Sequence, residues 1–227
     1  ADARNNPASL IRHVLQHPGN AKPVATADID LPALQHFSEW CAAKGFTYEN
    51  VITGQRPIRE VLREIAAAGR ASITKPDGRW SVVIDEPKTQ IAQHFTPHNS
   101  WGFKGKLLLP EIPHGLRVQF LNREKDYQPD EITVYADGYS AANATLIETI
   151  SLPGSTWAGT SAAPGPAYKL ARFHMEQMLL RREEYELYAD HEAIVCTRGD
   201  RVEVAHDVPM WGLGSGRIKS VTLDGSN

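Results

Sequence analysis

Apolar residues recur every three or four positions through the first third of the chain, a spacing that predicts helices. Three such segments follow one another. Asn6, Asp30 and Pro57 stand where they begin, because Asn and Asp side chains cap helix N-termini and proline fits the first turn. The segments end at three residues that commonly stop helices, Pro18, Gly45 and Gly69.

A β-hairpin is expected directly after the third helix. Residues 71–74 and 79–85 are rich in Ile, Val, Thr and Ser and surround Pro76-Asp77-Gly78. Pro and Asp-Gly favour tight turns, so the two β-prone runs are predicted to pair.

From residue 90 onward the period changes to two. In residues 116–122, Val118 and Phe120 alternate with Arg117 and Gln119, which is typical of an antiparallel strand with one wet face. The predicted strands are 90–95, 100–108, 116–122, 131–135, 144–150, 184–189, 193–196, 200–205 and 216–223.

Two further segments complete the expected architecture. Residues 153–166 are rich in Gly, Ser, Ala and Pro, which predicts a mobile connection, and a long helix is expected at 166–182. Helices and strands are segregated along the chain, which favours an α+β fold over a doubly wound sheet. We predict a helical subdomain with a hairpin at 5–88 and an antiparallel β-rich domain at 89–227 that contains the long helix.

Composition narrows the class of protein. Hydrophobic residues make up 41% of the 227 residues, charged residues 22%, and the net charge is −3. These values argue against a disordered chain, a collagen-like fibre and a coiled coil. The charge gives no indication of nucleic-acid or membrane binding, and no apolar stretch is long enough to span a membrane.

Cysteines and histidines offer few candidates for chemistry. Cys41 lies on a predicted apolar helix face and should be a buried thiol, and it forms no C-x-x-C pair with Cys196. His13 and His17 share a helix face, but the Glu that a metallopeptidase helix places after its first His is replaced by Val14. The remaining histidine pair, at 94 and 98, flanks a turn, where polarity explains it equally well.

Other motifs have simpler structural interpretations. Ser215 sits one position too late for a nucleophile elbow, so 212–217 is expected to be a hairpin loop. The acidic and histidine groups at 190–192 and 206–207 would point to opposite faces of a strand, which makes them poor catalytic partners. Arg198-Gly199-Asp200 is expected to be a turn in which Gly relaxes the backbone and Asp accepts a hydrogen bond. We therefore predict no catalytic, cofactor-binding or metal-binding residues.

Trp101 and Phe103 flank Gly102, and strand alternation would place both rings on one face. They could form a platform for sugar stacking or subunit contact. We prefer a position in the hydrophobic core.

The order of several segments is more informative than any single motif. Asn6-Pro7-Ala8 opens the series, followed by Phe37 with Trp40-Cys41, and then by Arg56 with 60–65. The later members are Asp77-Gly78-Arg79, 94–103 (HFTPHNSWGF), 117–122 (RVQFLN), 168–174 (YKLARFH), 196–204 (CTRGDRVEV) and Gly216-Arg217-Ile218. Over residues 6–222, this ordered set resembles the central region of the lambda-like phage tail tip attachment proteins, called host specificity protein J. It is also similar to related tail proteins of prophages and gene transfer agents.

The resemblance implies a structural function in the virion. Such proteins are similar to baseplate hubs, which form a trimeric ring that closes the distal end of the tail tube. Partners would be further copies of the protein and other tail tip and tail tube proteins. The tape measure protein and then DNA would pass through the lumen without specific binding, and a net charge of −3 is compatible with such a channel. The family has no catalytic residues or cofactor in this region and inserts no part of it into a membrane.

Two other functions stay open at the level of sequence. A host-surface module could bind glycan or protein through Trp101 and Trp157, and a metal-dependent hydrolase could use His94 and His98. The chain begins without methionine and ends on a predicted strand and turn, so we expect it to be part of a longer polypeptide.

Overall fold

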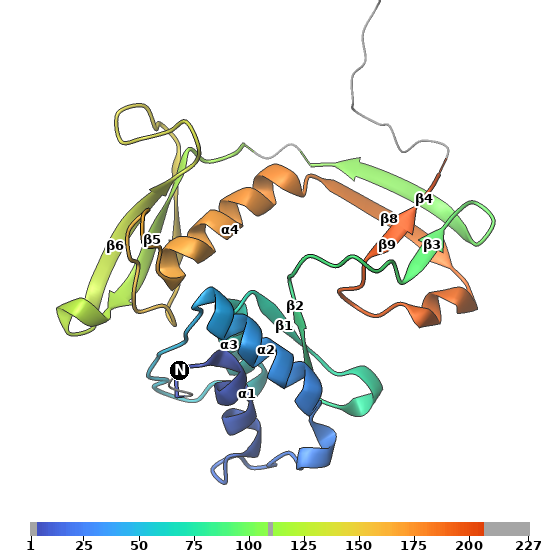
Figure 1. Ribbon diagram of the computed structural model, residues 1–227, viewed down its shortest axis with the longest axis horizontal. Helices are drawn as coiled ribbons and strands as arrows, with labels where there is room; N and C mark the ends of the chain where they lie inside the picture. Colours follow the sequence, from blue (N-terminus) through green and yellow to red (C-terminus); the bar gives the residue numbers. More distant parts are fainter. Residues whose placement is uncertain (1–3, 109–110, 207–227) are drawn as a thin grey trace, which may run out of the picture.

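The computed structural model describes residues 4–108 and 111–206, and in these ranges the chain forms four α-helices and nine β-strands. Figure 1 shows a helical part, a twisted sheet and a two-stranded extension joined by one long helix, α4 (Pro166–Leu180). Most of the small sheets are antiparallel. The expected α+β class is confirmed.

The helical part contains α1 (Pro7–Gln16), α2 (Leu31–Lys44) and α3 (Ile58–Ala68), followed by the hairpin of β1 (Ala71–Thr74) and β2 (Ser81–Ile84). All five elements were predicted from the sequence. The strands pair antiparallel across the turn, as Pro76-Asp77-Gly78 indicated.

The predicted helix ends are confirmed in detail. The Asn6 side chain accepts a hydrogen bond from the Ala8 amide at 3.0 Å, and Asp30 accepts one from the Ala33 amide at 3.2 Å. Each satisfies a donor that has no partner inside its own helix. Gly45 ends α2 in the left-handed region with φ 69°, a conformation that favours glycine.

The first hydrophobic core lies between these helices and the hairpin. At the end of α3, a Cβ on Gly69 would lie 2.5 Å from the Phe37 ring and 2.8 Å from the Cys41 sulfur, so the close approach needs glycine. The predicted buried thiol of Cys41 is confirmed, because its side chain is fully inaccessible. The members of this core include Phe37, Phe46, Tyr48, Leu62, Leu15, Ile11, Ile65 and Leu170.

The second core lies between α4 and a three-stranded sheet in the order β6-β5-β7. Its strands are β5 (Gly115–Asn122), β6 (Gln128–Tyr135) and β7 (Ile147–Ser151). The alternation expected in β5 is confirmed, with Val118 and Phe120 buried. Full burial of each such side chain contributes about 1.5–3 kcal/mol.

The two-stranded extension consists of β4 (Ser100–Leu107) and β8 (Glu183–Ala189), which pair antiparallel. A short parallel pair, β3 (Gln93–Phe95) and β9 (Val202–Val204), lies beside it. The second parallel pair is β5 with β7. Alternation of polar and apolar residues indicates which face of a strand is exposed to solvent. It does not indicate the direction of the neighbouring strand, so these parallel pairs were not predicted.

One predicted strand is wrong. Residues 193–196 do not form a strand, because His191–Val195 is a 3-10 helix. The Ala193 amide donates to the Asp190 carbonyl at 2.9 Å, and Ile194 and Val195 are largely exposed. The segment therefore has no apolar face to bury against a sheet. The predicted strand at 216–223 lies outside the described residues.

The segment at 153–166 also differs from the prediction of a mobile connection. Ser155 and Thr156 are 1% exposed, and the Thr156 hydroxyl donates to the Glu49 carboxylate at 2.8 Å. The Gly165 amide closes a tight loop on the Ala158 carbonyl at 2.7 Å. The small residues of this segment allow it to pack closely against its neighbours. A composition rich in Gly, Ser, Ala and Pro is typical of mobile loops as well, so the sequence alone does not distinguish a packed segment from a mobile one.

Candidate functional site

The histidine pairs do not form a larger cluster of ligands. The rings of His13 and His17 are 4.8 Å apart between centroids and meet edge to face. His94 in β3 and His98 in the turn after it are both exposed. Within residues 4–108 and 111–206, no group of three or more His, Cys, Asp or Glu side chains is arranged to hold a metal ion.

The acidic motifs lie outside the strands, although 190–192 was expected on one, because Asp190 precedes the 3-10 helix His191–Val195 and Asp200 directly follows a turn. His191 and Asp190 form an exposed contact at 2.6 Å, and Glu192 accepts a hydrogen bond from Asn99 at 2.8 Å. The Thr197 amide donates to the Asp200 carboxylate at 2.8 Å, which confirms the expected turn at Arg198-Gly199-Asp200. Asp207 and the loop at 212–217 with its serine lie outside the described residues.

The buried ionisable groups are held in structural roles. Burial raises the pKa of the Cys41 thiol to about 12, which makes it a poor nucleophile. Burial, together with a hydrogen bond to Glu64, raises the pKa of Tyr48 to about 12. Glu64 is itself paired with Arg56 at 2.9 Å. None of these groups lines one of the two surfaces described next.

The first surface is the two-stranded ribbon of β4 and β8. A bulge divides it, because Gly102 has φ 63° and the register shifts between Trp101 and Lys104. Trp101 lies opposite Tyr188, whereas Phe103 stacks on Tyr185 at 5.6 Å between centroids. Tyr185 and Tyr188 are three positions apart on one strand, so Trp101 and Phe103 lie on opposite faces of the ribbon.

The preferred position of Trp101 in the core is therefore wrong. Its side chain is 57% exposed. Without the bulge, alternation would have placed it with Phe103, which is half-buried and stacks on His206 at 4.4 Å. Glycine in a strand can signal a bulge, and Gly102 was the sequence signal that could have corrected the assignment.

The two faces of the ribbon differ in chemistry. One face carries lysines opposite glutamates, including Lys104 and Glu186 at 3.9 Å. The other carries aromatic and aliphatic side chains, of which Tyr185 and Leu107 are each 44% exposed. In the described part of the chain, neither outer edge of the ribbon pairs with another strand. The ribbon thus offers unpaired backbone edges and a partly uncovered apolar face.

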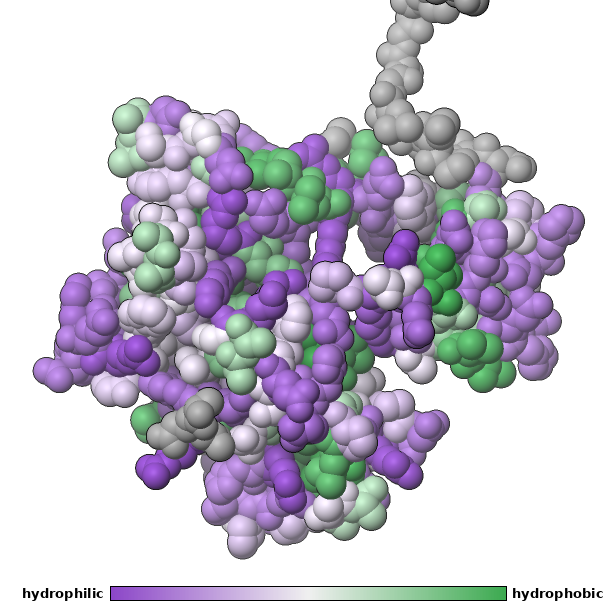
Figure 2. All heavy atoms as spheres, viewed as in Figure 1, coloured by the Kyte–Doolittle hydropathy of each residue, from purple (hydrophilic) through white to green (hydrophobic). Residues whose placement is uncertain are grey.

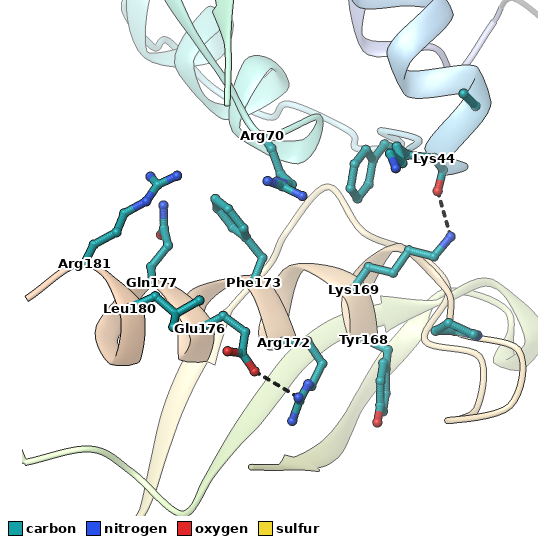
Figure 3. A pocket seen from close by; sticks show the side chains of 13 residues that line it. Lys44, Arg70, Tyr168, Lys169, Arg172, Phe173, Glu176, Gln177, Leu180 and Arg181 are labelled. Atoms are coloured by element: carbon teal, nitrogen blue, oxygen red, sulfur yellow. Dashed lines mark hydrogen bonds and ion pairs between the residues drawn. The ribbon is translucent and has the colours of Figure 1, made fainter. Parts of the chain in front are cut away.

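The second surface is a cavity of about 670 Å³ along α4. It lies between α4, the C-terminal end of α2 and Arg70, the second residue after α3 (Figure 3). Its apolar lining comes from Phe46, Phe173, Leu180, Ala43, Pro164 and the ring of Tyr168. Figure 2 shows apolar atoms exposed near the C-terminal end of α4, where Leu180 is 75% exposed.

Five cationic side chains and one carboxylate also line this cavity: Lys44, Arg70, Lys169, Arg172, Arg181 and Glu176. Part of this surface could be predicted from the sequence. Its α4 residues recur at helical spacing and therefore share one face of the helix: Lys169, Phe173, Glu176 and Leu180. That face could not be assigned to a cavity before the position of α2 and α3 was known.

Comparisons with known proteins give structural similarity only. No family model matches the chain, and no curated protein matches it. A tail protein from Neisseria meningitidis MC58 is 12% identical with a TM-score of 0.49, over 77% of this chain and 57% of that one. A chain of a native gene transfer agent virion is 13% identical with a TM-score of 0.45, over 66% and 36%.

A third similar structure is the 43 kDa tail protein of prophage MuSo2 from Shewanella oneidensis. It is 11% identical with a TM-score of 0.34, over 67% of this chain and 46% of that one. These three structures are of tail or virion proteins, and this chain spans less than two thirds of each. In the described residues, no helix is both long and apolar enough to cross a bilayer.

Proposed function

We propose that the chain is a structural part of a phage or prophage tail and has no catalytic function. In this proposal it belongs to the ring that closes the tail tube at its tip, where the full-length protein assembles as a trimer. It contacts other copies and the neighbouring tail tip and tail tube proteins. The tape measure protein and DNA pass through the ring without specific binding, and the site of action is the virion tail tip.

The observation that carries the proposal is the β4–β8 ribbon, whose outer edges pair with no strand of residues 4–108 and 111–206. An isolated pair of strands is only marginally stable in water, and open edges readily pair with another chain. This ribbon also leaves Tyr185 and Leu107 partly uncovered on its apolar face. A neighbouring subunit would extend the sheet and cover that face, as repeated contacts in a closed ring require.

The order of segments in the sequence supports the same conclusion independently. The resemblance runs over residues 6–222 and includes residues of β4, β5 and α4. It involves elements of both hydrophobic cores, so it concerns the whole arrangement of elements.

Sedimentation of the full-length protein tests the proposal. We expect the wild-type protein to form a trimer. The double variant Leu107→Ser/Tyr185→Ser should raise the dissociation constant of the trimer at least about tenfold, because each substitution removes apolar area that a neighbouring subunit covers. Val51→Ser is the matched control, since Val51 is 82% exposed in the helical part. A full-length protein that stays monomeric, both alone and in isolated tails, would contradict the proposal.

A second candidate function rests on Trp101. Its ring lies opposite Tyr188, and the two side chains are 57% and 51% exposed on the charged face of the ribbon. Exposed aromatic pairs can stack on sugars or anchor a protein partner. Specific glycan binding by this chain, lost in Trp101→Ser, would favour host-surface recognition over a purely structural function.

A further inference from the structure

Some of the cationic side chains that line the cavity along α4 are paired with carboxylates, and others are not. Arg172 is bound by Asp137 and Glu176 at 3.0 and 2.9 Å, and Arg181 is bound by Asp85 at 2.6 Å. In the ranges that the structure describes, Lys44, Lys169 and Arg70 form no ion pair with a carboxylate. Three of the five cations are therefore available to a ligand.

The three free cations are held in place by other contacts. The Lys169 ammonium donates to the Lys44 carbonyl at 2.7 Å, and Lys44 lies over the Trp40 ring at 5.1 Å. The two lysines thus sit together at the C-terminal end of α2, where cations stabilise the helix dipole. The interaction of two lysines with a helix dipole needs no apolar surface. It therefore does not explain the aromatic and aliphatic lining of the cavity.

Arg70 is the most unusual residue of the cavity. It has φ 59°, its guanidinium lies 3.9 Å over the Phe173 ring, and one terminal nitrogen donates to the Asp85 carbonyl at 2.9 Å. Its buried Nε has no hydrogen-bond partner among the described residues. A non-glycine residue at positive φ and an unused buried donor are both unfavourable, and both occur beside the free lysines.

The cavity continues beyond Arg70. A second cavity of about 670 Å³ shares Arg70, Phe173, Gln177 and Arg181 with the first and extends to the β2 strand and the turn at 198–201. The first cavity is lined by residues from Tyr168 to Arg181 along α4 and so forms a groove along most of the helix, and the second cavity lies beyond the contact of Arg70 with Phe173. An elongated groove suits a chain-shaped ligand better than a compact one.

The mixed lining distinguishes between classes of chain-shaped ligand. A DNA duplex presents its phosphates on the outside, and cations alone suffice to bind it without sequence preference. This groove places Phe46, Tyr168, Phe173 and Leu180 between its cations, as sites that bind peptides through apolar anchors do. We propose that the α4 groove binds an acidic peptide segment of a partner protein, with a bulky apolar side chain seated between Phe173 and Leu180 and flanking carboxylates at Lys44, Lys169 and Arg70.

Fluorescence anisotropy with the purified chain tests this proposal. The probe is a short fluorescein-labelled peptide with a Leu-Trp pair flanked on both sides by glutamates. We expect Lys44→Glu/Lys169→Glu to weaken binding at least about tenfold, the effect of about 1.4 kcal/mol. Lys22→Glu/Lys75→Glu reverses two exposed lysines outside the groove and the ribbon and should leave binding unchanged.

A second pair of measurements separates the apolar contribution. Leu180→Ser should weaken the peptide without changing the thermal midpoint, because Leu180 is 75% exposed. A probe with glutamines in place of the glutamates should also bind more weakly. Absence of binding, equal binding of the glutamine probe, or equal loss in the control variant would each overturn the proposal.

Two other outcomes would reassign the groove. Tighter binding of a DNA duplex than of the peptide, lost in Lys44→Glu/Lys169→Glu, would make it a nucleic-acid surface. Self-association of the chain without peptide, lost in the same variant, would make a second copy the occupant. The proposal does not depend on the tail ring, since the ribbon variants test that function separately.

Discussion

Asp85 joins the N-terminal hairpin to the end of α4 through one carboxylate. Arg181 donates two hydrogen bonds to it, at 2.6 and 2.8 Å, and Gln177 donates a third at 3.4 Å. The bonds from Arg181 hold the pKa of Asp85 below its ordinary value, although partial burial acts in the opposite direction. The ionised form of the Asp85 carboxylate therefore stabilises the folded state.

The depressed pKa predicts a pH dependence of stability. A group with a lower pKa in the folded state stabilises the protein above its unfolded pKa, about 3.9 for Asp, and this contribution disappears as pH falls through the folded pKa. Wild type should thus exceed Asp85→Asn in stability near neutral pH, and the difference should shrink with acidification. Urea denaturation at several pH values measures it.

Asp126→Asn is the matched control for this prediction. Asp126 is exposed, and it forms no ion pair with the residues described. Its variant should follow wild type across the same pH range. A stability difference between wild type and Asp85→Asn that stays constant down to low pH would show that the charge of Asp85 is not what stabilises the contact.

At the residue scale, the sequence predicts what depends on immediate neighbours. The caps at Asn6 and Asp30 and the left-handed Gly45 follow from local backbone chemistry, and they were predicted. Arg70 was not, because its position over Phe173 depends on a distant segment, although its positive φ belongs to the end of α3, where its amide donates to the Ala67 carbonyl at 3.0 Å. Such contacts between distant segments also form the part of the candidate groove that is lined by Ala43, Lys44, Phe46 and Arg70.

At the element scale, the strong periodic signals gave correct elements and the weak ones did not. β5 and α3 each have a clear apolar face and were predicted nearly to the residue. Residues 193–196 have β-branched side chains but no face to bury, and the chain turns there instead. The ribbon was predicted as two strands, but the bulge at Gly102 decides which side chains share a face.

The ordered segment at 153–166 leads to a prediction for hydrogen exchange. The amides of Ser155, Gly165 and Ala167 donate to backbone carbonyls at 3.1, 2.7 and 3.2 Å, and the side chains of Ser155 and Thr156 are 1% exposed. Buried, bonded amides exchange only when the structure opens. They should therefore exchange more slowly than the amides at 51–53, where Val51 is 82% exposed.

Hydrogen exchange followed by mass spectrometry of the isolated chain makes this comparison directly. Peptides covering 153–166 and 49–55 can be compared in one experiment. Equal, rapid exchange in both would mean that the connection orders only in an assembly, as its composition first indicated.

At the scale of the whole molecule, α4 takes part in both hydrophobic cores. Leu170 packs into the helical core and is 3% exposed, while Ala171 and Met175 pack into the core of the three-stranded sheet. One rigid helix therefore links two groups of elements that are separate in the sequence. The boundary between 5–88 and 89–227 stays a prediction, and α4 is the element that can test it.

Leu170→Ala measures how strongly the two cores are coupled. Removing a buried leucine side chain costs about 2–5 kcal/mol through lost burial and the remaining cavity. If α4 transmits this loss, native-state hydrogen exchange should accelerate in α3 and in β5 together. Leu180→Ala on the same helix is the control and should change stability by less than about 0.5 kcal/mol, because Leu180 is 75% exposed. Faster exchange confined to the helical core would instead mean that the two parts unfold independently, and that α4 only touches the first core without joining it to the sheet.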